Sequence, residues 1–397
     1  CAVCAEDYAP GVFYGCRRCS AASFRREVGM TVVVVLVVIL GVTTFVLDLV
    51  RVEHGSTEEQ VRAGRFLERK WYYFRALLVK VFPLTTIKIV VVVWQIVTQF
   101  ADIAGNVYPD VYERFLSKLS IINLDMGFLS YSCIVTTDFY DRLLFATIGP
   151  LVVLAVLTST YCVARKRYIS SEVAMSAMRH KHLSAALFVV FFIYPSVSST
   201  IFQVFVCDKD VFYLRADYSL ECYTKTHRAY MVYAILMVCV YPIGIPAALA
   251  WWLALNRVDL KKTDREAMAH LEPFRNLWAA YRPSRFYYEV LEFVRRITLT
   301  GVAVFILPDS MAQIAIVLLL AMVFLFISES LAPFENWVDT GIYRWGNGII
   351  LASMYVALLQ FEASEEDSQT FTAFSIALIA AHIFMVVTVL VQAIFLV

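Results

Sequence analysis

Residues 287–307 form an apolar stretch whose first half contains Glu289, Glu292, Arg295 and Arg296. Charges in such a stretch are costly unless they are paired or serve a function. Glu292 precedes the two arginines by three and four residues, a spacing at which side chains of one helix pair. The pattern permits two interpretations: the charged entrance of a path through a membrane, or a salt-bridged brace between helices. It does not predict a voltage sensor, which needs arginines at every third position.

Two further apolar stretches are each interrupted by a Tyr-Pro pair, at positions 194–195 and 241–242. Proline removes a backbone donor and kinks a membrane helix, so a neighbouring group must satisfy the freed carbonyl. Both breaks fall at similar depth, as in the broken helices of transporters and channels. The alternative is that these prolines only shape packing. The candidate kink residues are Pro195, Ser198, Ser199, Pro242, Gly244 and Pro246.

Residues 82–103 carry three polar side chains at helical spacing. Lys88, Gln95 and Gln99 are seven and four residues apart, which places them near one helical face. That face should look into the protein, because lipid-facing polar groups are costly. For Lys88, near one end of the stretch, snorkelling to the membrane surface is the alternative. Glu329, in another apolar stretch, completes the candidate pore or charge-network residues.

The composition places these stretches in a membrane. Hydrophobic residues make up 60% of the chain and charged residues 17%, whereas soluble domains are nearer half apolar and a quarter charged. A net charge of +1 gives no reason to expect a nucleic-acid partner. We predict an all-α, polytopic transmembrane bundle of about nine spans. They cover residues 30–50, 82–103, 143–164, 183–206, 230–255, 287–307, 311–331, 343–361 and 371–397.

One apolar segment, residues 112–135, is not counted as a span. Lys118, Asn123, Asp125 and Gly127 interrupt it. We therefore predict an interfacial or re-entrant element and not a full crossing. If the segment crossed the membrane, every later segment would change sides.

The distribution of basic residues fixes the expected orientation. With nine spans and the N-terminus outside, the inner segments hold about twice as many Lys and Arg residues as the outer ones, which agrees with the positive-inside rule. The C-terminus is then cytoplasmic. The rule therefore predicts that residues 1–27 and 207–228 are extracellular.

Cysteine placement agrees with this orientation. Two CxxC pairs lie near the start of the chain, a spacing found in zinc modules and in small disulfide modules alike. Disulfides persist outside the cell, and zinc knuckles are mostly intracellular, so the topology favours disulfides and no metal. The cysteines expected in disulfides are Cys1, Cys4, Cys16, Cys19, Cys207 and Cys222.

Sequence signatures of enzymes are absent. The chain contains no P-loop and no HExxH, GxSxG or GxGxxG motif, and its six histidines are scattered or lie in predicted cytoplasmic loops. We therefore expect no enzyme and no cofactor.

Four segments carry a resemblance to a known family: 193–203 (IYPSVSSTIFQ), 213–218 (YLRADY), 240–246 (VYPIGIP) and 295–301 (RRITLTG). They resemble a large group of protist and algal membrane proteins that are similar to the fungal TRP-like, flavin-carrier-type channels. The resemblance covers most of residues 82–331. The CxxC pairs of residues 1–19 look like the last of the EGF-like or ephrin-receptor-like repeats that usually precede this membrane part.

The resemblance implies a TRP-like, calcium-permeable cation channel of a eukaryotic surface or ciliary membrane, gated through the kinked spans 183–206 and 230–255. It transfers no pore residue. The turn between residues 307 and 311 is too short for a pore helix and filter, so helices would line the pore. Two alternatives remain: a non-transporting anchor or receptor for a long cysteine-rich extracellular stalk, and a lipid scramblase with an open polar groove.

The domain organisation follows from these assignments. Residues 1–27 are the end of an extracellular cysteine-rich repeat, residues 28–80 a first transmembrane helix with a cytoplasmic amphipathic linker, and residues 81–397 the multispanning domain. Because the sequence begins inside a cysteine cluster and ends inside an apolar run, we expect it to be the core of a longer polypeptide. The expected partners are the lipid bilayer and a homo-oligomer or larger membrane and extracellular assembly.

Overall fold

The structure, a computed structural model, describes residues 8–10, 16–18, 84–104, 108–123, 138–167, 172–208, 210–261, 271, 274–308, 310–362 and 368–395. Within these residues six segments are long and apolar enough to cross a membrane. They are Thr85–Ala104, Phe139–Lys166, Met178–Gln203, Lys225–Leu255, Met311–Leu331 and Thr370–Gln392. The chain is therefore a mostly helical, multi-pass membrane protein. The expected span 30–50 and the linker 51–80 lie outside the described residues.

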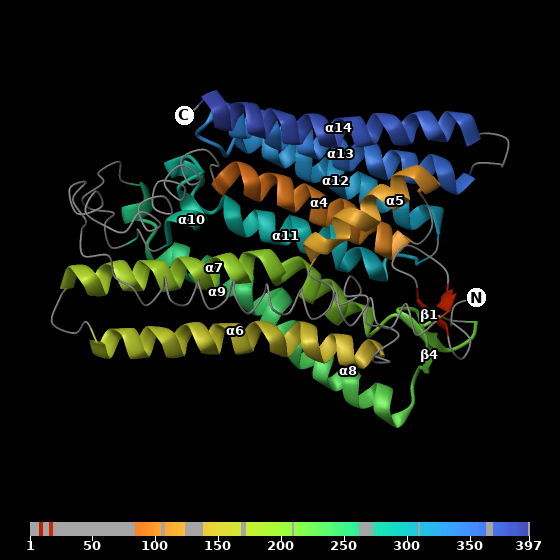
Figure 1. Ribbon diagram of the computed structural model, residues 1–397, viewed down its shortest axis with the longest axis horizontal. Coiled ribbons are helices and arrows are strands. Elements are labelled where there is room, and N and C mark those ends of the chain that lie inside the picture. Colours follow the sequence, from red (N-terminus) through yellow and green to blue (C-terminus); the bar gives the residue numbers. More distant parts are fainter. Residues whose placement is uncertain are drawn as a thin grey trace.

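The long helices lie roughly parallel and alternate in direction along the chain (Figure 1). Their bounds are α4 (Leu84–Ala104), α6 (Phe139–Arg167), α7 (Glu172–Gln203), α8 (Lys225–Val238), α9 (Ile245–Leu255), α11 (Tyr288–Thr300), α12 (Met311–Leu331), α13 (Trp337–Glu362) and α14 (Ser368–Phe395). Helices α8 and α9 are continuous through a π-helical segment, Cys239–Gly244. Shorter helices are α5 (Asp110–Leu119) and α10 (Arg275–Trp278).

Two expected spans are shorter or more polar than a simple membrane helix. Helix α11 has 13 residues and gives way after Thr300 to a 3-10 turn at Val302–Phe305, so it covers only part of the expected span 287–307. Helix α13 has 26 residues, but Asp339 and Arg344 lie in its first third. Neither meets the length and apolarity of the six candidate spans.

The helices pack into two lobes. One core joins α4, α5, α12, α13 and α14, and a second joins α6, α7, α8 and the hairpin that precedes α8. Helix α11 lies between them, where Tyr194 of α7 packs against Phe293 and Ile297. Helix α4 is central: 67% of its most apolar 18-residue stretch is buried inside the protein, compared with 17% for α6. A central helix can carry polar groups because other helices surround it.

Two small antiparallel hairpins lie at the same end of the bundle (Figure 1). Strand β1 (Tyr8–Pro10) pairs with β2 (Cys16–Arg18), and β3 (Tyr213–Leu214) pairs with β4 (Asp217–Glu221). Cys16 begins β2, whereas the other N-terminal cysteines lie outside the described residues, so the expected disulfides there are not described.

Helix α5 contains the first part of the segment 112–135. At 10 residues it is about 15 Å long, too short to cross a bilayer, and it packs against α4 and α14. The Tyr112 hydroxyl lies 2.8 Å from Ser353 Oγ and 3.0 Å from His382 Nε2. These contacts bring α5 against the middle of α13 and α14. Residues 124–135 lie outside the described part of the chain.

Candidate functional site

Helices α4 and α11 and the π-helical segment between α8 and α9 all contact α7 at its Tyr194-Pro195 break. Proline at position 195 has no N–H, so the carbonyl of Phe191, four residues earlier, loses its helical donor and the turn before the proline is loosened. Helix α7 nevertheless continues to Gln203 without interruption. Its neighbours therefore must supply what the backbone lacks.

Helix α4 places two side-chain donors at this turn. Gln95 Nε2 donates to the carbonyl of Phe192, three residues before the proline, at 2.8 Å. One turn further along α4, Gln99 Nε2 donates to Ser196 Oγ at 3.0 Å. Gln95 and Gln99 are 0% and 4% exposed, so the polar face predicted for this helix looks into the protein.

The second break is linked directly to the first. Proline at position 246 has no N–H, so the carbonyl of Pro242, four residues earlier, loses its helical donor. The Tyr194 hydroxyl donates to that carbonyl at 3.2 Å. The sequence predicted two separate breaks, and in the structure a side chain of one satisfies a backbone carbonyl of the other.

Between α8 and α9 the chain forms a wider, π-helical turn at Cys239–Gly244. This turn brings the Cys239 carbonyl so close to Gly244 that a Cβ at position 244 would lie 2.6 Å from its oxygen. Only glycine fits there without a shift of the backbone. Single-turn π segments inside helices are frequent at functional sites.

Of the serines after Pro195, neither predicted kink residue satisfies an open carbonyl in the structure. Ser198 and Ser199 are buried, and the Ser198 hydroxyl has no hydrogen-bond partner within the described residues. Thr200 Oγ1 donates at 3.0 Å to the Ser196 carbonyl, which lies after the proline.

The charged residues of α11 form a second part of the site. Arg295 donates to both carboxylate oxygens of Glu292, and its Nη1 donates to Asn347 Oδ1 of α13 at 3.0 Å. The Tyr343 hydroxyl of α13 donates to Glu292 as well. Glu292 and Arg295 are nearly inaccessible to solvent. The predicted pairing along α11 is present, and α13 shares in it.

Lys88 of α4 extends this cluster. Its ammonium group forms an ion pair with Glu289 of α11, and the Tyr281 hydroxyl donates to the same carboxylate oxygen at 2.8 Å. The Lys88 side chain is 20% exposed. Lys88 is thus held inside the bundle, and the alternative of snorkelling to the surface does not describe it.

Phe191 connects the charged cluster to the broken turn. The Lys88 Nζ atom lies 4.3 Å and the Arg296 guanidinium carbon 3.9 Å from the centre of its ring, both within the range of cation–π attraction. The neighbouring Tyr194 ring stacks edge-on against Phe293, with centroids 4.7 Å apart. A movement of α7 at this break would therefore displace the α11 side chains that contact it.

Glu329 is not brought to this site. It pairs with Arg344 on the bundle surface, where both side chains are well exposed. The partners that sequence reasoning missed are Tyr281, Tyr343 and Asn347. A signal for Asn347 existed, because it is a polar residue within the expected span 343–361, but its direction could not be known without the packing of α13 on α11.

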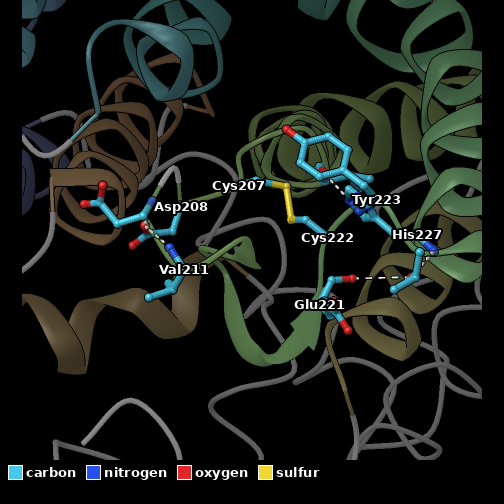
Figure 2. The surroundings of a disulfide bond; sticks show 10 residues. Cys207, Asp208, Val211, Glu221, Cys222, Tyr223 and His227 are labelled. Carbon is cyan, nitrogen blue, oxygen red and sulfur yellow. Dashed lines mark hydrogen bonds between the residues drawn. A yellow bond between two sulfur atoms is a disulfide. The ribbon is translucent and has the colours of Figure 1, made fainter.

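A disulfide joins the end of α7 to the start of α8 across the connecting hairpin. Cys207 follows α7, Cys222 precedes α8, and the two are bonded as Figure 2 shows. His227 adds a second link: its Nε2 lies 3.0 Å from the Val204 carbonyl, and its Nδ1 accepts from the Tyr223 amide. Since both ring nitrogens and both sulfurs are engaged, these three side chains do not offer a metal site.

Comparisons with known proteins give no relative: no protein-family model, curated protein or solved structure matches the chain. The site therefore has to be interpreted from its own geometry. It consists of two hydrogen-bonded helix breaks, a buried charge cluster and an aromatic contact between them.

Proposed function

We propose that the chain is a TRP-like, helix-lined cation channel of a eukaryotic surface or ciliary membrane, with nine spans, an extracellular N-terminus and a cytoplasmic C-terminus. Gating would act through the contact between the α7 break and the π-helical turn. The cysteine-rich segment would pass force or ligand binding to these helices through the disulfide-bonded hairpin. Calcium permeation belongs to this proposal through the family resemblance.

One observation carries the proposal: a line of polar side chains runs along α4 through the protein interior. Lys88 lies in the charge cluster, Gln95 binds the α7 break, and Gln99 lies within 3.5 Å of Asn123 Oδ1. Lys88 and Gln99 are 11 residues apart, which is about 16 Å along a helix, or roughly half the hydrocarbon thickness. Buried polar groups at membrane depth are functional candidates by default.

Val92 interrupts this polar line. It lies four residues after Lys88 and three before Gln95, so all three share one helical face, and it is 3% exposed. An apolar side chain between two polar groups is a site where a pore closes by dewetting. We therefore assign Val92 as the apolar barrier of the closed channel.

The test replaces the barrier. The full chain carrying Val92→Ser, reconstituted into lipid bilayers, should pass larger cation currents than the wild-type chain, because a hydroxyl keeps the constriction wet. Val91→Ser is the matched control, since residue 91 points about 100° away from this face. Folded Val92→Ser protein that passes no current would contradict the channel.

A second function, a non-transporting membrane anchor for an extracellular stalk, is favoured by the pairing in the charge cluster. Lys88 pairs with Glu289 and Arg295 pairs with Glu292, so these groups act as a brace between α4, α11 and α13. An anchor needs only this rigidity. Folded wild-type and Val92→Ser proteins that both pass no ions, while the brace variants Glu289→Gln and Glu292→Gln unfold more easily, would support it.

A further inference from the structure

Arg296 lacks the carboxylate that its charged neighbours have. The other two cations of the cluster, Lys88 and Arg295, each form an ion pair with a glutamate. By contrast, Arg296 Nε and Nη1 have no hydrogen-bond acceptor among the residues that the structure describes. The side chain is 1% exposed. A buried guanidinium without an acceptor is costly, so the site calls for a ligand that accepts hydrogen bonds.

The charges at this site do not cancel. Within the described part of the chain the cluster has three cations and two carboxylates, which leaves one positive charge. Asp339, a further buried carboxylate of α13, accepts from Thr86 Oγ1 at 2.9 Å and does not line the cavity beside Arg296. A single monovalent anion would balance the cluster.

The cavity lies between α4, α11 and α13, and three of its lining residues are cations. Its lining includes Lys88, Arg295, Arg296, Glu292 and Asn347. Both Glu292 oxygens already accept from Arg295, and Asn347 Oδ1 accepts from Arg295 as well. Glu289 Oε1, which has no donor among the described residues, does not line this cavity. An anion only accepts.

The size of the cavity limits the anion. Its volume is about 20 Å³. A single water occupies roughly 10–15 Å³, so a monatomic ion fits. A halide is monovalent and only accepts hydrogen bonds, and the cavity has room for it.

We propose that this cavity binds one halide ion, chloride in the cell, with Arg296 and Lys88 as its donors. The ion would complete the brace between α4, α11 and α13. This inference is independent of the proposed channel, because it concerns a bound ion and not a permeating one.

The test is thermal unfolding of the purified full chain in detergent, in sodium chloride, sodium bromide, sodium sulfate and sodium gluconate at equal ionic strength. Chloride and bromide should raise the unfolding temperature by a few degrees in a saturable way, and sulfate and gluconate should not. At 100 times the dissociation constant the unfolding constant should fall about 100-fold. Equal unfolding temperatures in all four salts would overturn the proposal.

Variants assign the effect to the cavity. Arg296→Gln should lose the halide-specific shift, and Arg344→Gln, which changes an exposed arginine, should keep it. If Arg296→Gln does not fold, Arg296→Lys keeps a cation there and should show weaker halide dependence. A full shift in a folded Arg296 variant would overturn the assignment. Cation current without a halide shift would contradict only this inference, and a halide shift without current only the channel.

Discussion

The two Tyr-Pro breaks contain the same dipeptide, yet their helices respond differently. Helix α7 continues through Pro195 as an α-helix, whereas the segment around Pro242 widens into a π-helical turn. The α7 break removes one backbone donor. The second segment has prolines at 242 and 246, which remove two donors one turn apart, and it has Gly244, which fits the wide turn.

The comparison shows that side chains of adjacent helices donate the hydrogen bonds that the backbone carbonyls at a proline break need. Gln95 of α4 donates to the carbonyl of Phe192, and Tyr194 of α7 donates to the carbonyl of Pro242. The Tyr241 hydroxyl similarly donates to the carbonyl of Thr147, three residues before Pro150 of α6, at 2.6 Å. In each case a long polar side chain from an adjacent helix reaches the loosened turn.

The largest expected effect comes from separating the end of α7 from the start of α8. The Cys207→Ser, Cys222→Ser double variant removes a disulfide that closes 15 residues of chain. Chain entropy predicts a loss of about 3 kcal/mol in the free energy of unfolding. Denaturant unfolding in mixed micelles measures it.

The control for that variant is Cys239→Ser, which changes a free, exposed cysteine of the π-helical turn. It should leave stability nearly unchanged. Equal losses in both would mean that the disulfide does not stabilise the pair of helices.

Gly244→Ala disturbs the π-helical turn alone. Its Cβ would lie 2.6 Å from the Cys239 oxygen, so the backbone must shift, at a cost of about 1–3 kcal/mol. Gly348→Ala is the matched control, because no atom lies within 4 Å of a Cβ built there. Thermal unfolding compares the two variants. A Gly244→Ala protein as stable as the control would show that the turn tolerates a side chain.

Gln95→Leu removes a hydrogen bond at the α7 break alone. It leaves the Phe192 carbonyl without its side-chain donor and should cost about 1 kcal/mol. Pro195→Ala removes the ring that disturbs this turn and restores a donor to the adjacent Phe191 carbonyl, so Gln95→Leu should cost less in that background. The difference is read from a double-mutant cycle. Equal costs in both backgrounds would separate Gln95 from the proline.

Much of this arrangement was predictable from sequence, but the pairings were not. The positions of both breaks, the inward face of α4 and the pairing of Glu292 with Arg295 follow from spacing alone. Which carbonyl Gln95 reaches depends on the rotation of α7 against α4, and spacing within one helix carries no such information. The shortness of α11 was missed because an apolar run indicates burial and not where a helix ends.

A smaller effect should come from the hydrogen bond between the two breaks. Tyr194→Phe keeps the ring on Phe293 and removes the donor to the Pro242 carbonyl, so about 0.6 kcal/mol should be lost. In a Pro246→Ala background the backbone amide at 246 can donate to that carbonyl, and the loss should shrink. Tyr355→Phe, at an exposed site of α13, is the control. An unchanged loss in the Pro246→Ala background would mean that the hydroxyl does not replace the amide.

The smallest effect concerns Asp208, in the hairpin that links the two breaks. Hydrogen bonds from the Asp210 amide and the Tyr218 hydroxyl lower the pKa of Asp208 below its ordinary value. The folded protein then binds fewer protons there than the unfolded chain, so this stabilisation is present above the unfolded pKa of about 3.9 and is lost as pH falls through the folded value. Asp208→Asn should flatten the loss of stability below about pH 4, and Asp210→Asn should not. Unfolding temperatures between pH 3 and pH 6 compare the two, and identical profiles would mean that the hairpin holds the helix ends through its disulfide and not through Asp208.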